Sequence, residues 1–212
     1  MTRLLCVLTM LTLLVGCATT EAEKQLELRE LFKKADLQER DRDYSGARSV
    51  YGEILEINPK HARARFRRGT NHAREKNWGD AIEDLTEAIE LHRMYASAFY
   101  NRGECYRGMW NEDLAARQNL TKAMDDYRRA IEVDRNHPKA HKKLAFLLAL
   151  YPEKRQKHQA IHHYRRHLKI VRMDAQAERW LDKLLREYGD PREEEKAREG
   201  KQADQKSPKK AK

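Results

Sequence analysis

The chain has 212 residues, with 44 lysines and arginines against 34 aspartates and glutamates, which gives a formal net charge of +10. This length is sufficient for one domain or a short array of repeats, but not for two large enzyme domains. The 9 glycines and 5 prolines exclude collagen-like and glycine-rich linker proteins, and the scarcity of valine, isoleucine and threonine after position 20 excludes an all-β sandwich.

The N-terminal segment differs in composition from the rest of the chain. Arg3 is followed by an apolar run, Leu4 to Val15, which is shorter than the roughly 20 residues that a membrane-spanning helix needs. A basic start followed by a short apolar run is typical of a secretory signal peptide. The segment is therefore predicted to direct export.

The apolar run ends in the sequence LVGC at 14–17, which resembles the lipobox of bacterial lipoproteins. The resemblance implies that residues 1–16 are removed as a signal peptide and that the thiol and amine of Cys17 are acylated, for example with palmitate. An uncleaved anchor, or an ordinary signal peptide with a chance cysteine, is the alternative. Ala18 stands where an aspartate would resemble an inner-membrane retention signal, so the outer membrane, facing the periplasm of a Gram-negative envelope, is favoured over the inner membrane.

The remaining cysteines allow no internal disulfide in the folded part. Cys6 lies within the predicted signal peptide and Cys17 is the predicted acylation site, which leaves Cys105. Cys105 occupies a helical position suited to a small buried residue and is not expected to be a nucleophile. Stability must then come from helix packing.

Residues of similar size recur every 34 positions along the chain. The matching sets are Ala35, Gly69 and Gly103; Tyr44 and Trp78; Ala47 and Ala81; Tyr51 and Leu85; and Ile54 and Ala88. This pattern, together with the closing turn at Asn58-Pro59, resembles the tetratricopeptide repeat. The resemblance implies an all-α fold, a right-handed superhelical stack of helix-turn-helix repeats. Small residues at the repeated positions allow two helix backbones to approach closely.

The pattern divides the chain into consecutive segments. Residues 17–27 are predicted to be the lipidated cysteine and a polar tether, 28–61, 62–95, 96–137 and 138–174 four repeats, 175–189 a capping helix, and 190–212 a disordered charged tail. The fourth repeat keeps Ala145, Ala160 and Tyr164 in place but has His167 where a small residue is usual.

The third repeat is longer than the others by 8 residues, since Ala88 and Ala130 are 42 apart. An insertion of about two helical turns keeps the same face buried. We expect this insertion in a lengthened second helix that begins near Asn111. Its inner stripe would consist of Ala116, Leu120, Ala123, Tyr127 and Ala130.

The first helix of each repeat is expected to line a basic concave groove. Positions that face this groove hold ten cations, namely Arg29, Lys33, Arg40, Arg63, Arg67, Arg74, Arg107, Lys139, Lys142 and Lys143, against the acids Asp36, Glu39 and Glu104. Phe32, Phe66, Tyr100 and Phe146 are interleaved with them. The predicted partner-binding residues are Arg63, Phe66, Arg67, Tyr100, Asn101, Lys139, Lys142 and Lys143, which would attract an acidic or extended segment. Alternatively, these charges only keep the protein soluble.

A narrower match concerns the carboxylate clamp of chaperone-binding members of the repeat family. Asn101, Lys139 and Lys143 resemble three of its five residues. Phe66 and Thr70 stand where that pattern has lysine and asparagine, so the match is incomplete.

Other chemistries find less support in the sequence. His158 and His162, and His163 and His167, are four residues apart on a predicted helix and can share a metal ion, but two ligands do not complete a site. The chain has no G-x-S-x-G, no H-E-x-x-H and no phosphate-binding glycine loop. We therefore predict neither an enzyme nor a metal or cofactor site, and export argues against nucleic acid as a partner.

Together these features favour a membrane-anchored scaffold or adaptor in the bacterial cell envelope that binds a segment of another envelope protein. The alternative is a structural envelope protein that associates with copies of itself. The sequence does not identify the partner, the oligomeric state or the face that binds.

Overall fold

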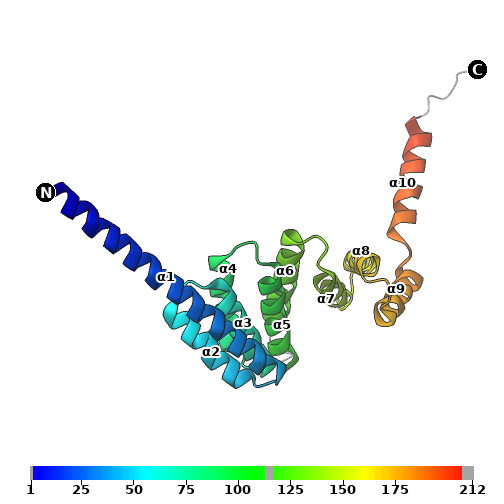
Figure 1. Ribbon diagram of the computed structural model, residues 1–212. Coiled ribbons are helices and arrows are strands. Elements are labelled where there is room, and N and C mark those ends of the chain that lie inside the picture. Colours follow the sequence, from blue (N-terminus) through cyan, green and yellow to red (C-terminus); the bar gives the residue numbers. More distant parts are fainter. Residues whose placement is uncertain (1, 113–116, 207–212) are drawn as a thin grey trace, which may run out of the picture. The chain divides into compact units, whose positions relative to one another are not determined.

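In a computed structural model, which describes residues 2–112 and 117–206 of the chain, every regular element is a helix (Figure 1). The side chains described are those of residues 20–112 and 117–199. The helices are α1 (Thr2–Arg40), α2 (Tyr44–Ile57), α3 (Ala62–Arg74), α4 (Trp78–Leu91), α5 (Ala96–Glu112), α6 (Arg117–Val133), α7 (Pro138–Leu148), α8 (Lys154–Ile170), α9 (Ala175–Tyr188) and α10 (Pro191–Lys206). This confirms the all-α prediction. Among the described residues, no helix combines the length and the apolar character needed to cross a membrane.

The helices form two compact units, Met1–Asp113 and Leu114–Lys212, which are described separately. In the first unit, α1 packs on α2, α2 on α3, α3 on α4 and α4 on α5. The residues that recur every 34 positions form its core: Ala35, Ala47, Tyr51, Ile54, Ala81, Leu85 and Ala88 have no exposed surface, and Gly69 and Gly103 are buried. The periodicity therefore identified the buried positions correctly in four of its five sets, whereas Tyr44 and Trp78 are half-buried.

Gly69 shows why a small residue is required where α3 crosses α4. A Cβ atom at this position would lie 2.9 Å from the Cβ of Asp84 and 3.2 Å from the backbone oxygen of Ala81. Beside it, Arg68 donates two hydrogen bonds, of 2.7 and 2.8 Å, to the buried carboxylate of Asp84. The two helices are thus held in close contact by one glycine and one charged pair.

In the second unit, α6 packs on α7, α7 on α8 and α8 on α9. Tyr127 and Tyr164 are buried at positions equivalent to Tyr51 in the first unit, and Ala123 and Ala160 are buried beside them. These residues belong to the inner stripes expected for the third and fourth repeats. The helix α9 occupies the segment expected to cap the stack.

The position where His167 replaces a small residue is a polar junction between three helices. The Nδ1 atom of His167 lies 3.0 Å from the backbone oxygen of Pro138, and its Nε2 atom lies 2.9 Å from Oδ2 of Asp174. Asp174 also caps α9, because its Oδ1 accepts a hydrogen bond from the backbone N–H of Ala177 at 3.0 Å. Lys142 donates a further hydrogen bond of 2.7 Å, which holds the pKa of Asp174 well below its usual range.

The extra length of the third repeat is not confined to its second helix. The helix α5 has 17 residues against 13 in α3, and α6 has 17 against 14 in α4. Asn111, where we expected the second helix to begin, lies in α5. The added turn of α5 is stabilised by Trp78, whose indole packs against Gly108 and whose Nε1 donates a 2.8 Å hydrogen bond to Glu112. Ala116 lies outside the described residues.

The expected polar tether and part of the expected disordered tail are both helical. Residues 18–27, the expected tether, continue α1, and Leu28 at their end is buried in the core. Residues 191–206, within the expected tail, form α10, which starts with proline and has Glu193 and Glu194 in its first turn. Glu194 accepts a hydrogen bond from Lys154, and Asp190 accepts two from Arg165, so charged contacts with α8 hold the start of this helix.

Candidate functional site

A cleft of about 570 Å³ lies between α3 and α5 in the first unit. Its wall from α3 includes Thr70 and Arg74, and its wall from α5 includes Asn101 and Asn111. The Nδ2 atom of Asn101 donates a 2.9 Å hydrogen bond to the hydroxyl of Thr70, which itself donates to the backbone oxygen of Phe66 at 2.7 Å. The cleft thus has a fixed polar floor, and Trp78 supplies an aromatic surface at its end.

Among the cations that line this cleft, Arg107 is paired with a carboxylate, whereas Arg74 and Lys76 have no ion pair within the described residues. Arg107 pairs with Glu104 at 3.0 Å on α5, and the guanidinium of Arg74 lies 4.8 Å from the ring centroid of Tyr44. Of the predicted partner-binding residues in this region, Asn101 lines the cleft and Tyr100 is half-buried, with burial raising the pKa of its phenol. Phe66 is half-buried and stacks on Tyr95 with ring centroids 4.5 Å apart.

Arg67 lies in a half-buried polar network between α1, α2 and α3. Its Nη2 atom is 2.5 Å from Oδ1 of Asp36 and 2.8 Å from Oε2 of Glu39, and its Nε donates a 3.1 Å hydrogen bond to the hydroxyl of Tyr51. Glu39 also accepts a 2.8 Å hydrogen bond from Asn71. Burial raises the pKa of Tyr51 to about 12. Two carboxylates therefore face the charge of Arg67, whereas the helical spacing predicted that all three side chains would face the groove separately.

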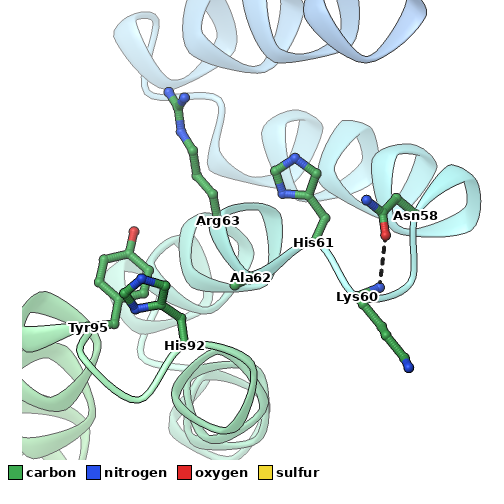
Figure 2. Close-up of a pocket in the computed structure, with 7 residues that line it drawn as sticks. All are labelled: Asn58, Lys60, His61, Ala62, Arg63, His92 and Tyr95. Carbon is green, nitrogen blue, oxygen red and sulfur yellow. Dashed lines mark hydrogen bonds between the residues drawn. The ribbon is translucent and has the colours of Figure 1, made fainter. Parts of the chain in front are cut away.

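A second pocket, of about 450 Å³, lies at the turns that precede α3 and α5 (Figure 2). It is lined by Asn58, Lys60, His61, Ala62, Arg63, His92 and Tyr95. The turn before α3 is fixed by Asn58, whose Oδ1 accepts from the backbone N–H of Lys60 at 3.1 Å, and by His61, whose Nδ1 accepts from the backbone N–H of Ala64 at 3.3 Å. Burial lowers the pKa of His61. Sequence reasoning found Arg63 but missed the other six residues, which lie at or beside the turns, outside the helical periodicity.

The predicted lysines of the fourth repeat lie in the second unit. Lys139 is exposed, Lys143 is half-buried, and Lys142 is bound to Asp174. Asn101 is in the first unit, so neither unit by itself contains the three residues that resemble a carboxylate clamp.

The histidines of α8 do not form the pairs expected for a metal site. His158 contacts the backbone oxygen of Tyr188, and both ring nitrogens of His167 face other groups. Over the part of the chain that the structure describes, no group of three or more His, Cys, Asp or Glu residues is arranged to hold a metal ion. The pair that does form is His141 and His163, whose Nδ1 atoms are 2.9 Å apart.

Known proteins resemble this chain over part of its length. No family model matches the chain. DnaJ homolog subfamily C member 7 of Homo sapiens is 28% identical over 106 residues, 48% of this chain and 19% of that protein. Serine/threonine-protein phosphatase 5 of Homo sapiens is 33% identical over 73 residues, 34% of this chain and 15% of that protein. The chain therefore spans less than a fifth of the length of either relative.

Solved structures match over more of the chain. A crystal structure of the MamA protein matches with a TM-score of 0.62 and 20% identity, over 76% of this chain and 81% of that one. The first TPR domain of Spaghetti (RPAP3), solved bound to the HSP90 peptide SRMEEVD, matches with a TM-score of 0.53 and 22% identity, over 58% of this chain and 92% of that one. The chain has the tetratricopeptide-repeat fold. In tetratricopeptide-repeat terms, the cleft lies between the first helices of the second and third repeats.

Proposed function

We propose that this protein is a membrane-anchored interaction scaffold of a bacterial cell envelope, acylated at Cys17, that holds an extended segment of another envelope protein in the cleft between α3 and α5. It acts by recognition alone, without a catalytic step or a cofactor. The outer membrane, facing the periplasm, is the proposed location.

The observation that carries this proposal is the fixed polar floor of the cleft. The side-chain amides of Asn101 and Asn111 offer a donor and an acceptor each to the backbone of an extended peptide, and Trp78 offers contact area for a side chain. The similarity to a TPR domain solved with a bound HSP90 peptide supports the same use of the fold in this chain. The lining carries the carboxylates of Glu104 and Glu112 beside its cations, which favours recognition of backbone and shape over a strongly acidic ligand.

Site-specific photocrosslinking tests the cleft. A benzophenone amino acid at Asn111, exposed at the mouth of the cleft, is expected to capture a partner protein in cells. The matched control carries the same group at Ser49, which is exposed on α2. Equal capture from both positions would remove the cleft from the proposal, and capture of a second copy of this chain from Asn111 would favour the self-associating alternative.

Acylation is tested separately by metabolic labelling with an alkyne analogue of palmitate. The wild-type protein is expected to carry the label and to fractionate with membranes, because Cys17 supplies the thiol that is modified. The Cys17→Ala variant should lose the label, whereas Cys6→Ala should keep it. Retention of the label in Cys17→Ala would contradict the proposed anchor.

A further inference from the structure

We propose that the pocket at the turns before α3 and α5 is a second binding surface, which recognises an acidic extended segment of a partner protein. This surface is separate from the cleft between α3 and α5, and it does not depend on the function proposed for that cleft. We call it the turn pocket and define it by the seven lining residues in Figure 2.

The turn pocket presents hydrogen-bond donors and contains no carboxylate among its lining residues. His61 accepts a backbone hydrogen bond through Nδ1, so in its neutral form the ring proton lies on Nε2, where it can be donated. Asn58 uses its Oδ1 to accept from Lys60, which leaves the amide NH₂ as the donating end of that side chain. With the ammonium of Lys60 and the guanidinium of Arg63, these groups form a donor set suited to carboxylates.

The two cations of the turn pocket have no carboxylate partner. Within residues 20–112 and 117–199, no carboxylate lies within ion-pair distance of Lys60 or Arg63, whereas Arg107 in the lining of the cleft is paired with Glu104. The guanidinium of Arg63 lies over the ring face of Phe32, with 5.0 Å between its Cζ atom and the ring centroid. The turn pocket therefore presents two cations and no carboxylate, whereas the lining of the cleft combines the cations Arg74, Lys76 and Arg107 with the carboxylates of Glu104 and Glu112.

Apolar groups border the same surface. Tyr95 stacks on Phe66 and packs edge-on against His92, with ring centroids 5.7 Å apart. Met94, in the same turn, has 67% of its surface exposed. A partner that alternates acidic and apolar side chains would place its carboxylates on the cations and its apolar groups against Tyr95 and Met94.

The arrangement of the cations favours an extended ligand over a single small anion. Figure 2 shows Arg63 and Lys60 directed to opposite sides of the turn that joins α2 and α3, with His92 and Tyr95 contributed by the neighbouring turn. One phosphate group would not bridge cations that point apart, whereas carboxylates spaced along a peptide can reach both.

Fluorescence anisotropy with the purified full-length chain tests this inference. The probe is a fluorescein-labelled peptide of repeated Glu-Gly-Leu triplets, compared with the same peptide carrying Gln in place of Glu. The Glu peptide is expected to bind and to lose affinity with rising salt. The variant Lys60→Gln/Arg63→Gln should weaken binding by roughly tenfold or more, because two charge-assisted contacts are lost.

The matched control is Lys169→Gln/Arg172→Gln, which removes the same net charge from exposed positions in the second unit and should leave the affinity unchanged. Equal weakening by both double variants would mean that net charge alone attracts the peptide. Equal binding of the Gln peptide would mean that carboxylates are not recognised. Either result overturns the inference.

Binding to phosphatidylglycerol vesicles is measured with the same variants. If Lys60→Gln/Arg63→Gln loses vesicle binding but keeps peptide binding, the surface binds lipid and the inference is overturned. Crosslinking from Asn111 reports on the cleft independently.

Discussion

Replacing Arg67 by methionine is expected to lower the free energy of unfolding by about 1 to 2 kcal/mol, between the cost of breaking an exposed ion pair and that of breaking a buried one. The substitution leaves Glu39, whose side chain is 10% exposed, and the carboxylate of Asp36 without their cation, and it removes the hydrogen bond to Tyr51. Urea unfolding followed by circular dichroism measures the change.

Arg63→Met is the matched control, since Arg63 lies one turn earlier on α3 and has no carboxylate partner in the described part of the chain; its cost should stay within about 0.5 kcal/mol. Adding Glu39→Gln to Arg67→Met should recover part of the loss, because a neutral amide is less costly to bury than an unpaired carboxylate. If Arg67→Met unfolds at the same urea concentration as the wild type, the polar network does not stabilise the fold.

The role of Arg67 in stability limits its use in binding experiments. Arg67→Glu would place a third carboxylate beside Asp36 and Glu39, so a loss of partner binding in that variant would report unfolding. Charge reversals at Lys60 and Arg63 do not have this problem, because neither cation is paired with a carboxylate within residues 20–112 and 117–199.

The second unit is expected to lose about 1 to 2 kcal/mol of stability when the pH falls from about 7.5 to about 5. Burial between α7 and α8 lowers the pKa of His163 from 6.5 to about 3, and the nearby positive charges of His141, His162 and Arg128 act in the same direction. The pKa of His141 is likewise lowered, mainly by burial and with contributions from Arg166, His162 and His137. The folded state therefore keeps both rings neutral at a pH where the unfolded chain binds protons.

The loss of stability at lower pH follows from the lowered pKa values of the two histidines. Because the folded pKa of His163 lies below its unfolded value, this stability is fully present above about pH 6.5 and is lost as the pH falls toward 3. The geometry gives a reason for the lowered pKa of His141: its Nε2 donates to the backbone oxygen of Arg135, so its Nδ1 accepts a hydrogen bond from Nδ1 of His163. Protonation of His141 would place two N–H groups face to face.

The test compares amide hydrogen exchange of α7 and α8 at the two pH values, corrected for intrinsic exchange rates. His163→Gln keeps a donor toward His141 without a titrating ring, and it should flatten the pH dependence of protection. His162→Gln, at the exposed neighbouring position, removes a smaller contribution and should keep most of the dependence, because burial is the main cause of both pKa shifts. An unchanged slope in His163→Gln would show that other groups cause the acid sensitivity.

Much of the fold was predictable because its core repeats at a fixed interval. Ala47, Ala81, Ala123 and Ala160 share one helical position, so their burial follows from periodicity alone. The length of α5 did not follow, because it depends on Trp78 packing against Gly108, 30 residues away in the sequence. The helix α10 was not predicted because ion pairs with α8 hold its start, and a hydrophobicity pattern does not indicate ion pairs.

The candidate site was less predictable than the fold. Helical spacing in the sequence indicates which residues lie on the same face of a helix, but it does not indicate which of their charges form ion pairs. Arg67 and Glu39 are 28 positions apart, and Lys142 and Asp174 are 32 apart, so these pairs exist only once the helices pack. The turn pocket combines two loops, for which neither helical spacing nor repeat columns give a signal.

Asp174 has a consequence for where this array can end. One carboxylate starts α9, receives Lys142 from α7 and contacts His167 from α8, so three consecutive helices share a single anchoring point. Shortening the chain before this residue would strip α7 and α8 of a partner as well as removing α9. We therefore expect α9 to unfold together with α7 and α8, because the polar contacts of Asp174 join it to both helices in addition to their packing.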